Sequence, residues 1–146
     1  MRNIFSIYSM ADTAVILYHP AVGRYSLSEG GAGRITIARS GDLSSHTVTP
    51  DGTVVINRLC SRHGTVTVEI PQNSAADLFM RRWISYMESR VKGADYAAAT
   101  LTVRDAACEH TYILTGVTPQ KWPDITYDRT AGNVVYTLLA ASVSEQ

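Results

Sequence analysis

Residues 64–90 read GTVTVEIPQNSAADLFMRRWISYMESR, and this stretch decides the fold. Its first seven residues alternate, so that Val66, Val68 and Ile70 share one face and polar side chains share the other. Such a period of two is typical of a β-strand with one buried face. Pro71 has no N–H to donate to a neighbouring strand, and we expect the strand to end there.

The second half of this stretch has the pattern of a helix. Ser74 has the position of an N-cap, and Asp77 follows three residues later, so a hydroxyl and a carboxylate can accept hydrogen bonds from the free N–H groups of the first turn. The following residues contain no Pro or Gly as far as Arg90. The spacing predicts an amphipathic helix over about 74–90, packed against a sheet. Its core residues are Met80, Trp83 and Met87.

Short β-branched runs, separated by turn residues, make up most of the remaining chain. The sequence predicts strands at 13–19, 24–28, 35–38, 45–49, 53–60, 100–104, 111–116, 124–127 and 133–143. Pro50-Asp-Gly52 lies between two of these runs and indicates a hairpin turn. This pattern predicts a mainly β fold, a two-sheet antiparallel β-sandwich or barrel with one flanking α-helix. The length favours a single domain over residues 1–146.

The last predicted strand is apolar on both faces. Val134, Tyr136 and Leu138 share one face, whereas Val135 and Leu139 lie on the other. An antiparallel strand commonly has one face in water. We therefore expect this strand to be either central or covered by another subunit, and Val135 and Leu139 are candidate inter-subunit contacts.

The composition excludes several functional classes. Thirteen basic and thirteen acidic residues give no net charge, which disfavours tight binding of nucleic acid. No apolar run approaches the roughly 20 residues of a membrane span, and the first residues lack the apolar core of a signal peptide. Two cysteines are too few for a disulfide scaffold, so we expect a protein that is made in a reducing cytoplasm and has no membrane partner.

No motif indicates catalysis or a cofactor. The glycines of 30–33 precede a predicted strand and not the helix N-terminus that a phosphate loop requires. Two Cys and two His residues could in principle form a zinc site, but their spacing is unusual, and buried thiols with surface histidines fit better. These residues are Cys60, His63, Cys108 and His110. None of the histidines lies in a recognisable nucleophile motif. We expect no enzyme activity, no metal and no cofactor.

Several short motifs follow one another in a recognisable order. They are Tyr8-Ser9 with Asp12, the glycine loop before Arg34-Ile-Thr-Ile37, Asp51-Gly52, Gly64-Thr-Val-Thr-Val68, Ser74, Leu101-Thr-Val-Arg-Asp105, Pro123-Asp-Ile-Thr-Tyr127 and Gly132-Asn-Val-Val-Tyr-Thr137. Together they resemble the family of tail tube subunits of contractile-tailed bacteriophages. The resemblance covers nearly the whole chain, and the polar stretch at 39–49 departs from the family pattern.

This resemblance implies a structural role in a virion tail. It implies a β-sandwich or barrel flanked by a helix, hexameric rings, and a stack of rings through which double-stranded DNA passes. The implied partners are further copies of the chain and the tail sheath and baseplate proteins, with assembly in the cytoplasm of the host bacterium. Two alternatives stay open: a terminator or baseplate ring protein of the same fold, and a monomeric β-sandwich that binds a ligand.

The polar segment at 39–52 is a candidate contact between rings or subunits. It has few side chains to bury, so an isolated subunit gains little by ordering it. The candidate contact residues are Arg39, Asp42, Leu43, His46 and Asp51. The alternative is an ordinary mobile loop without a partner.

Overall fold

The computed structural model describes residues 13–28, 31, 33–89, 93–106 and 109–146. These residues form eleven strands, one α-helix and a short 3-10 helix, η2 (Gly93–Ala97). The elements in chain order are β1 (Thr13–His19), β2 (Gly23–Ser26), β3 (Arg34–Arg39), β4 (Ser44–Val48), β5 (Val54–Arg58), β6 (Gly64–Pro71), α1 (Ala75–Glu88), β7 (Thr100–Asp105), β8 (His110–Thr115), β9 (Thr118–Pro119), β10 (Asn133–Ala140) and β11 (Ser142–Glu145).

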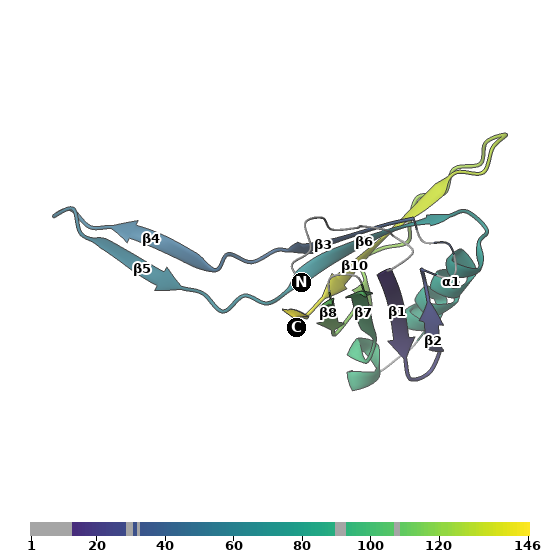
Figure 1. The fold of residues 1–146 in the computed structure, drawn as a ribbon, viewed down its shortest axis with the longest axis horizontal. Coiled ribbons are helices and arrows are strands. Elements are labelled where there is room, and N and C mark those ends of the chain that lie inside the picture. Colours follow the sequence, from purple (N-terminus) through teal and green to yellow (C-terminus); the bar gives the residue numbers. More distant parts are fainter. Residues whose placement is uncertain (1–12, 29–30, 32, 90–92, 107–108) are drawn as a thin grey trace, which may run out of the picture.

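Two antiparallel sheets form the body of the molecule. One has five strands in the order β11-β8-β7-β1-β2, and the other has four strands in the order β3-β6-β10-β9. The strands of the two sheets cross at a steep angle, as in orthogonally packed sandwiches (Figure 1). A separate two-stranded sheet, β4-β5, projects from the four-stranded sheet. The expectation of a mainly β, two-sheet antiparallel fold with one helix is confirmed.

The core lies between the two sheets and under α1. Alternate residues of β6 and β10 point inward, and α1 contacts β6, β2 and β9. Met80 and Trp83 are fully buried, and Met87 is nearly so. The predicted helix is present over Ala75–Glu88, with Ser74 as its N-cap. The helix therefore covers the side of the sandwich where β2 and β9 form the sheet edges.

The last predicted strand, 133–143, is wrong as a single element. β10 ends at Ala140, and after Ala141 the chain enters the other sheet as β11. The Ala141 N–H donates to the Thr115 carbonyl at 3.0 Å, which turns the chain at this corner. Val143 is therefore buried as part of the five-stranded sheet, whereas Val135 belongs to the four-stranded sheet. The apolar residues on the second face of 133–143 do not form one continuous face.

Two segments project from opposite ends of the four-stranded sheet (Figure 1). The first is the β4–β5 hairpin, which confirms the hairpin predicted around Pro50-Asp-Gly52. The second is the segment 120–132 between β9 and β10, which has no strand. The strand predicted at 124–127 is therefore wrong: these residues are exposed, so no buried face selects a register for them.

Candidate assembly surfaces

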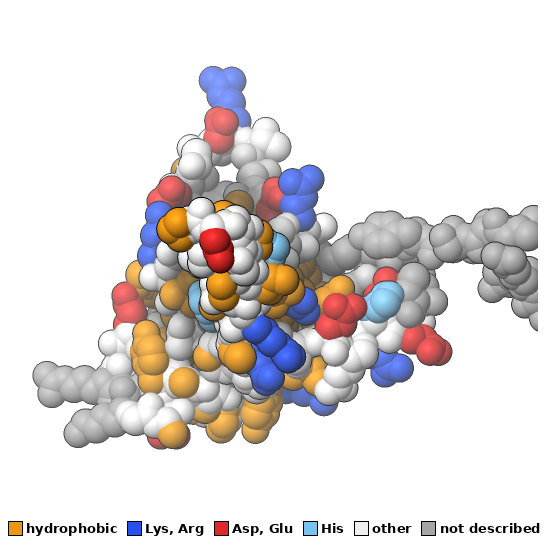
Figure 2. Space-filling model, turned by 90° about the vertical axis from the view of Figure 1, so that its left-hand side faces the viewer, with side chains coloured by type: hydrophobic (Ala, Val, Ile, Leu, Met, Phe, Trp, Pro, Cys, Tyr) orange, Lys and Arg blue, Asp and Glu red, His pale blue; other side chains and the backbone are white. Residues whose placement is uncertain are grey.

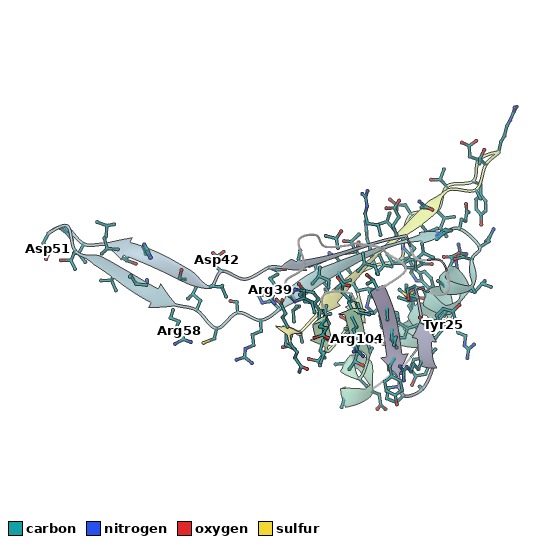
Figure 3. All side chains as sticks on the ribbon, viewed as in Figure 1. Tyr25, Arg39, Asp42, Asp51, Arg58 and Arg104 are labelled. Carbon is teal, nitrogen blue, oxygen red and sulfur yellow. The ribbon has the colours of Figure 1, made fainter. Side chains whose placement is uncertain are left out.

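The β4–β5 hairpin is closed by hydrogen bonds at its tip. The Thr49 N–H donates to the Thr53 carbonyl at 2.9 Å, and Asp51 accepts from the Thr49 hydroxyl and, at 3.0 Å, from the Thr53 N–H. These hydrogen bonds hold the pKa of Asp51 below its ordinary value, and the bond from the Thr49 hydroxyl has the largest effect. Gly52 has φ +87°, a conformation that side chains other than Gly disfavour. The Asp-Gly sequence thus fixes a tight turn far from the body of the protein (Figure 3).

One face of this hairpin is apolar and exposed. The register pairs His46 with Ile56 and Val48 with Val54, so these side chains share a face. Val48 is 68% exposed and Ile56 is 69% exposed. Figure 2, which views the molecule from the hairpin end, shows hydrophobic side chains at the surface next to charged ones. We call Val48, Val54 and Ile56 the apolar face of the hairpin.

The opposite face of the hairpin is held by polar contacts. The Asn57 side-chain amide donates to the hydroxyls of Ser45 and Thr47, each at 3.2 Å. Both faces of the hairpin lie in solvent, because every residue of β4 and all but one of β5 are exposed. An isolated two-stranded hairpin is only marginally stable in water. The exposed apolar face is therefore the part of this hairpin that a partner would stabilise.

The structure distributes the predicted contact residues of 39–52 along this projection. Asp42 and Leu43 lie at its base, His46 is in β4, and Asp51 is at the tip (Figure 3). Leu43 is largely exposed. Arg39 ends β3 on the body, where its guanidinium lies 3.7 Å from the Glu145 carboxylate. Four of the five residues thus lie on one projection, spread from its base to its tip (Figure 3), whereas Arg39 has a partner within its own chain.

Val135 and Leu139 lie on a different surface, the outer face of the four-stranded sheet. They are 47% and 40% exposed, while the alternate residues of β10 are buried. The register places Val135 beside Glu69 and Arg34, and Leu139 beside Thr65 and Ala38. This outer face includes Arg34, Thr36, Ala38, Thr65, Thr67, Glu69, Val135, Thr137 and Leu139. Among the described residues, no layer covers it.

The outer face carries no net charge. Its one basic and one acidic residue are Arg34 and Glu69, whose side chains are 3.9 Å apart. Glu69 also accepts a hydrogen bond from the Asn133 side-chain amide at 3.0 Å. The remaining positions are threonine or aliphatic. Such a surface offers few groups that attract a phosphate backbone.

The segment 120–132 is held only at its base in the described part of the chain. The Gln120 N–H donates to the Thr137 carbonyl at 3.1 Å, and the Gly132 carbonyl accepts from the Gln72 N–H at 2.9 Å. Near the base, the Trp122 indole N–H donates to Glu88 on α1. Tyr127 is 80% exposed, so an aromatic ring stands in solvent at the outer part of this segment.

A cleft of about 740 Å³ opens between β3 and the ends of the five-stranded sheet. Ile35, Ile37, Val103 and Tyr112 contribute its apolar lining. Arg39 and Glu145, which form the ion pair described above, also line it. The cleft therefore marks the side of the sandwich that α1 leaves open.

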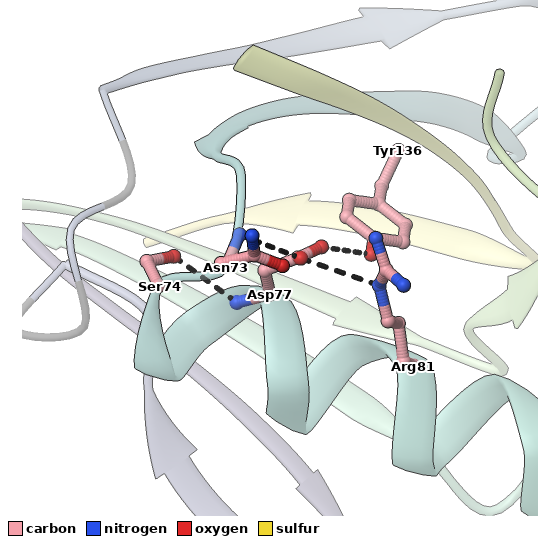
Figure 4. Close-up of polar contacts among 5 residues, drawn as sticks. All are labelled: Asn73, Ser74, Asp77, Arg81 and Tyr136. Atoms are coloured by element: carbon pink, nitrogen blue, oxygen red, sulfur yellow. Dashed lines mark hydrogen bonds and ion pairs between the residues drawn. The ribbon is translucent and has the colours of Figure 1, made fainter. Parts of the chain in front are cut away.

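A buried polar cluster joins α1 to β10 (Figure 4). The Asp77 carboxylate accepts from the Tyr136 hydroxyl and, at 3.0 Å, from the Asn73 N–H, and Arg81 Nε lies 3.2 Å from it. The Asp77 N–H donates to the Ser74 hydroxyl at 3.2 Å. The predicted cap is thus confirmed, and the carboxylate also binds two side chains that sequence reasoning missed. Burial, together with the hydrogen bond to Asp77, raises the pKa of Tyr136 and keeps its hydroxyl a donor.

Arg81 is tied to the core, because its guanidinium pairs with the fully buried carboxylate of Asp77. The signal in the sequence was the spacing Asp77–Arg81, which is an i,i+4 pair on a helix. Tyr136 could not be found this way, because it is 59 residues away in the sequence.

The candidate metal ligands are not assembled in the described residues. Cys60 is exposed, so the expectation of a buried thiol is wrong for this residue, whereas Cys108 is outside the described residues. His110 is exposed and lies 3.5 Å from Glu145. Within the described ranges, no group of three or more His, Cys, Asp or Glu side chains could hold a metal ion. No described helix is long and apolar enough to span a membrane.

Comparison with known proteins identifies a family. A family model described as "Bacteriophage PhiTE tail tube protein" matches residues 5–146. No curated protein sequence matches the chain.

Solved structures share the fold at low sequence identity. A chain of the anti-feeding prophage baseplate has a TM-score of 0.66 at 8% identity, with 99% of this chain and 97% of that chain covered. A chain of the sheath/tube terminator of the PVC extracellular contractile injection system has a TM-score of 0.63 at 11% identity, with 99% of each chain covered. A chain of the PVC sheath-tube complex has a TM-score of 0.60 at 13% identity, with 98% of this chain and 93% of that chain covered. These neighbours come from structural assemblies and not from enzymes.

Proposed function

Because this chain belongs to the family of the bacteriophage PhiTE tail tube protein, we propose that it forms hexameric rings that stack into the conduit through which DNA passes during ejection. The chain is a tail-tube-like structural protein of a contractile tail. The family match over residues 5–146 carries the proposal. The rings, their number of subunits and the passage of DNA go beyond that match, and the following observations support them.

Assembly is supported by exposed apolar surface at two separate places. Val135 and Leu139 lie on the outer face of the four-stranded sheet, where a neighbour in the same ring can cover them, whereas the apolar face of the hairpin projects beyond the end of that sheet (Figure 1). A heterologous interface, in which two different patches meet, closes into a ring when the rotation between copies allows it. Six copies per ring is proposed by analogy, since the similar anti-feeding prophage baseplate is described as 6-fold symmetrised.

The outer face of the four-stranded sheet suits the wall of a conduit. It is threonine-rich, it carries no net charge, and the described residues leave it uncovered. DNA that must slide through a tube is retarded by a basic lining, because each neutralised phosphate releases counterions and strengthens binding. We place this face toward the lumen. Val135 and Leu139 then lie at the side of the lumen surface where β10 borders β9, close to the neighbouring copy in the ring.

The partners proposed for the assembled tube are the tail sheath around it and the baseplate at its end. A similar chain occurs in a structure described as a sheath-tube complex, and another occurs in a baseplate. The location in the tail of the virion follows from the tube role, and assembly in the cytoplasm of the host bacterium is part of the same proposal.

A second candidate is a terminator or baseplate ring protein. The similarity to the PVC terminator and to the anti-feeding prophage baseplate chain, with TM-scores of 0.63 and 0.66, is as high as that to the sheath-tube complex at 0.60. Fold similarity at this identity does not separate the roles. A monomeric ligand-binding module is the third candidate, and the exposed apolar face of the hairpin disfavours it.

Light scattering over a wide range of protein concentrations tests this proposal. A tube subunit gives particles whose mass rises steeply with concentration, because ring faces repeat and stacking is open-ended. A terminator or baseplate subunit stops at the mass of one ring. A constant mass of about 15.9 kDa at every concentration would contradict assembly altogether.

A further inference from the structure

The two projections of the chain leave the body in opposite directions. The β4–β5 hairpin extends from one end of the four-stranded sheet, and the segment 120–132 extends from the other end (Figure 1). In a head-to-tail stack every copy has the same direction along the axis. The hairpin of one copy and the segment 120–132 of the next copy therefore approach the same junction. This step rests on the proposed function, because it assumes that copies stack.

Both projections lack a partner for their outer apolar side chains within the described chain. The hairpin exposes Val48, Val54 and Ile56, and the segment exposes Ile125 and Tyr127. In the described residues, no backbone–backbone hydrogen bond lies between 121 and 131. Burial of such side chains stabilises a contact by roughly 25 cal/mol per Å² of apolar surface removed from water. The two projections thus offer apolar surface that each can cover on the other.

The two projections are long enough to overlap. A strand rises by about 3.3 Å per residue, so the hairpin extends about 25 Å from Ser44 to the tip. The segment 120–132 is not a strand, and a fully extended chain at about 3.3–3.6 Å per residue lets it reach at most roughly 20 Å outward before it returns to the body. Because the two approach from opposite directions, they run past each other, and the tip of each lies near the base of the other.

The charges fit the same arrangement. Asp42 lies at the base of the hairpin and is exposed, with no ion pair or hydrogen bond among the described contacts (Figure 3). Arg129 lies at the outer part of the segment 120–132, and its side chain is likewise exposed and unpaired among the described residues. In the overlapping arrangement the base of the hairpin meets the tip of the segment 120–132. The negative charge of Asp42 and the positive charge of Arg129 therefore come together. Complementary charges of this kind fix the register of an interface more than its affinity.

We propose that the β4–β5 hairpin of each copy packs lengthwise against the segment 120–132 of the next copy in the stack. The apolar face of the hairpin covers Ile125 and Tyr127, and Asp42 pairs with Arg129. The acceptor of the hairpin is thus a second copy of this chain, and the joint is made by two projections and not by the bodies of the subunits.

Site-directed disulfide cross-linking tests the contact. In a Cys60→Ser, Cys108→Ser background, Ile56→Cys is combined with Ile125→Cys and the assembled protein is oxidised. The expected result is a covalent ladder that continues beyond the number of subunits in one ring, because each link joins one ring to the next. A ladder that ends at one ring would place the contact between neighbours within the ring and would overturn the proposal.

The matched control moves the cysteine to the other face of the same strand. Val55 is adjacent to Ile56 and is itself partly exposed, but it belongs to the face that carries Asn57. Val55→Cys with Ile125→Cys is expected to give at least about tenfold less cross-linked product. Equal yields from the two pairs would show that the links form by random collision and would also overturn the proposal.

Exchanging the charges of Asp42 and Arg129 tests independently how the hairpin and the segment 120–132 are aligned. Asp42→Arg alone and Arg129→Asp alone place like charges together, and each is expected to raise the concentration needed for stacking by about tenfold, equivalent to 1.4 kcal/mol. The double variant restores the concentration to within about twofold of the original. If the parent protein forms tubes but the double variant behaves as the sum of the singles, this contact fails while the tube role holds. If the parent protein forms no stack, the proposed function itself fails.

Discussion

Asp77 is a fully buried carboxylate, and the groups around it tie the first turn of α1 to the middle of β10. One residue here has several roles. Its N–H donates to the Ser74 hydroxyl, and its carboxylate accepts a hydrogen bond from the Asn73 N–H. The same carboxylate pairs with Arg81 and accepts a hydrogen bond from the Tyr136 hydroxyl. A buried carboxylate is tolerated only when such partners are present, since an unpaired buried charge is strongly destabilising.

The neighbouring arginines of α1 give a matched test of this cluster. Arg81→Ala removes the cation next to buried Asp77, so we expect the free energy of unfolding to fall by about 1–3 kcal/mol. Arg82→Ala, on the exposed side of the same helix, should change it by less than about 0.5 kcal/mol. Urea unfolding of both variants under conditions that prevent assembly measures the difference. Equal stabilities for the two variants would mean that the Arg81–Asp77 pair contributes nothing.

The buried hydroxyl of Tyr136 should make the free energy of unfolding depend on pH in the alkaline range. Burial raises its pKa in the folded protein, whereas in the unfolded chain it titrates near its ordinary value of about 10. The stability that its neutral form contributes is present below pH 10 and is lost as the pH rises above that value. Tyr136→Phe lacks this ionisation, so the stability gap between the parent protein and the variant should shrink by up to about 1.4 kcal/mol per pH unit above 10.

Urea unfolding of the parent protein and of Tyr136→Phe at several pH values from 8 to 11 makes this measurement. The comparison cancels the contribution of the other tyrosines. A gap that stays constant across this range would contradict the buried, neutral state of the hydroxyl.

At the scale of elements, the corner where the two sheets meet is controlled by a glycine. A Cβ on Gly64 would lie 2.7 Å from the Ala38 carbonyl oxygen and 2.8 Å from the Val143 side chain. Gly64 begins β6, and it therefore lets β3, β6 and β11 approach one another closely. The same corner explains why the chain can leave β10 and enter β11 within one residue.

Gly64→Ala should destabilise the fold by about 1–3 kcal/mol, because the added methyl group forces the backbone of β3 or the Val143 side chain to move. Gly132→Ala is the control, since a Cβ there would meet no atom within 4 Å. Thermal unfolding of both variants in an unassembled state compares them. If Gly132→Ala lowers the melting temperature as much as Gly64→Ala does, the close approach is not the cause.

Elements with a one-sided apolar pattern could be predicted from the sequence. β6 and α1 are specified by local sequence, because Val66, Val68 and Ile70 alternate with polar residues and the helix has its N-cap at Ser74. The hairpin was predictable from Asp51-Gly52, whose turn chemistry is local. By contrast, the break at Ala141 depends on contact with Thr115, far away in the chain, and no local pattern marks it.

The candidate surfaces were predictable only in part. The polar segment at 39–52 includes only one strand of the hairpin, β4. The apolar face of the hairpin depends on the pairing of β4 with β5, which this segment alone does not predict. The segment 120–132 looked like strand material, because Ile125 and Tyr127 are residues that favour strands. Strand propensity without a partner does not produce a strand, and here the same side chains remain exposed instead.

At the scale of the whole molecule, the subunit is a compact body with two projections that have little to pack against within one chain (Figure 1). The hairpin should therefore change its dynamics on assembly. Its amides in β4 and β5 are expected to exchange rapidly with solvent in free subunits, because an isolated hairpin opens readily. In assembled protein a neighbouring copy should slow their exchange by at least about tenfold.

Hydrogen exchange of free and assembled protein measures this change, with the amides of β6 as an internal reference that is protected in both states. Equal protection of 39–52 in the two states would remove the hairpin from the stacking interface. A hairpin that is already protected in the free subunit would show that it is stabilised within its own chain.

Electron cryo-microscopy of the purified, concentrated protein shows whether this chain stacks into a tube. We expect hollow tubes of stacked six-subunit rings, with the outer face of the β3-β6-β10-β9 sheet toward the lumen and the β4–β5 hairpin of each copy seated on the adjacent ring. Isolated rings without stacking, or single subunits at all concentrations, would contradict it.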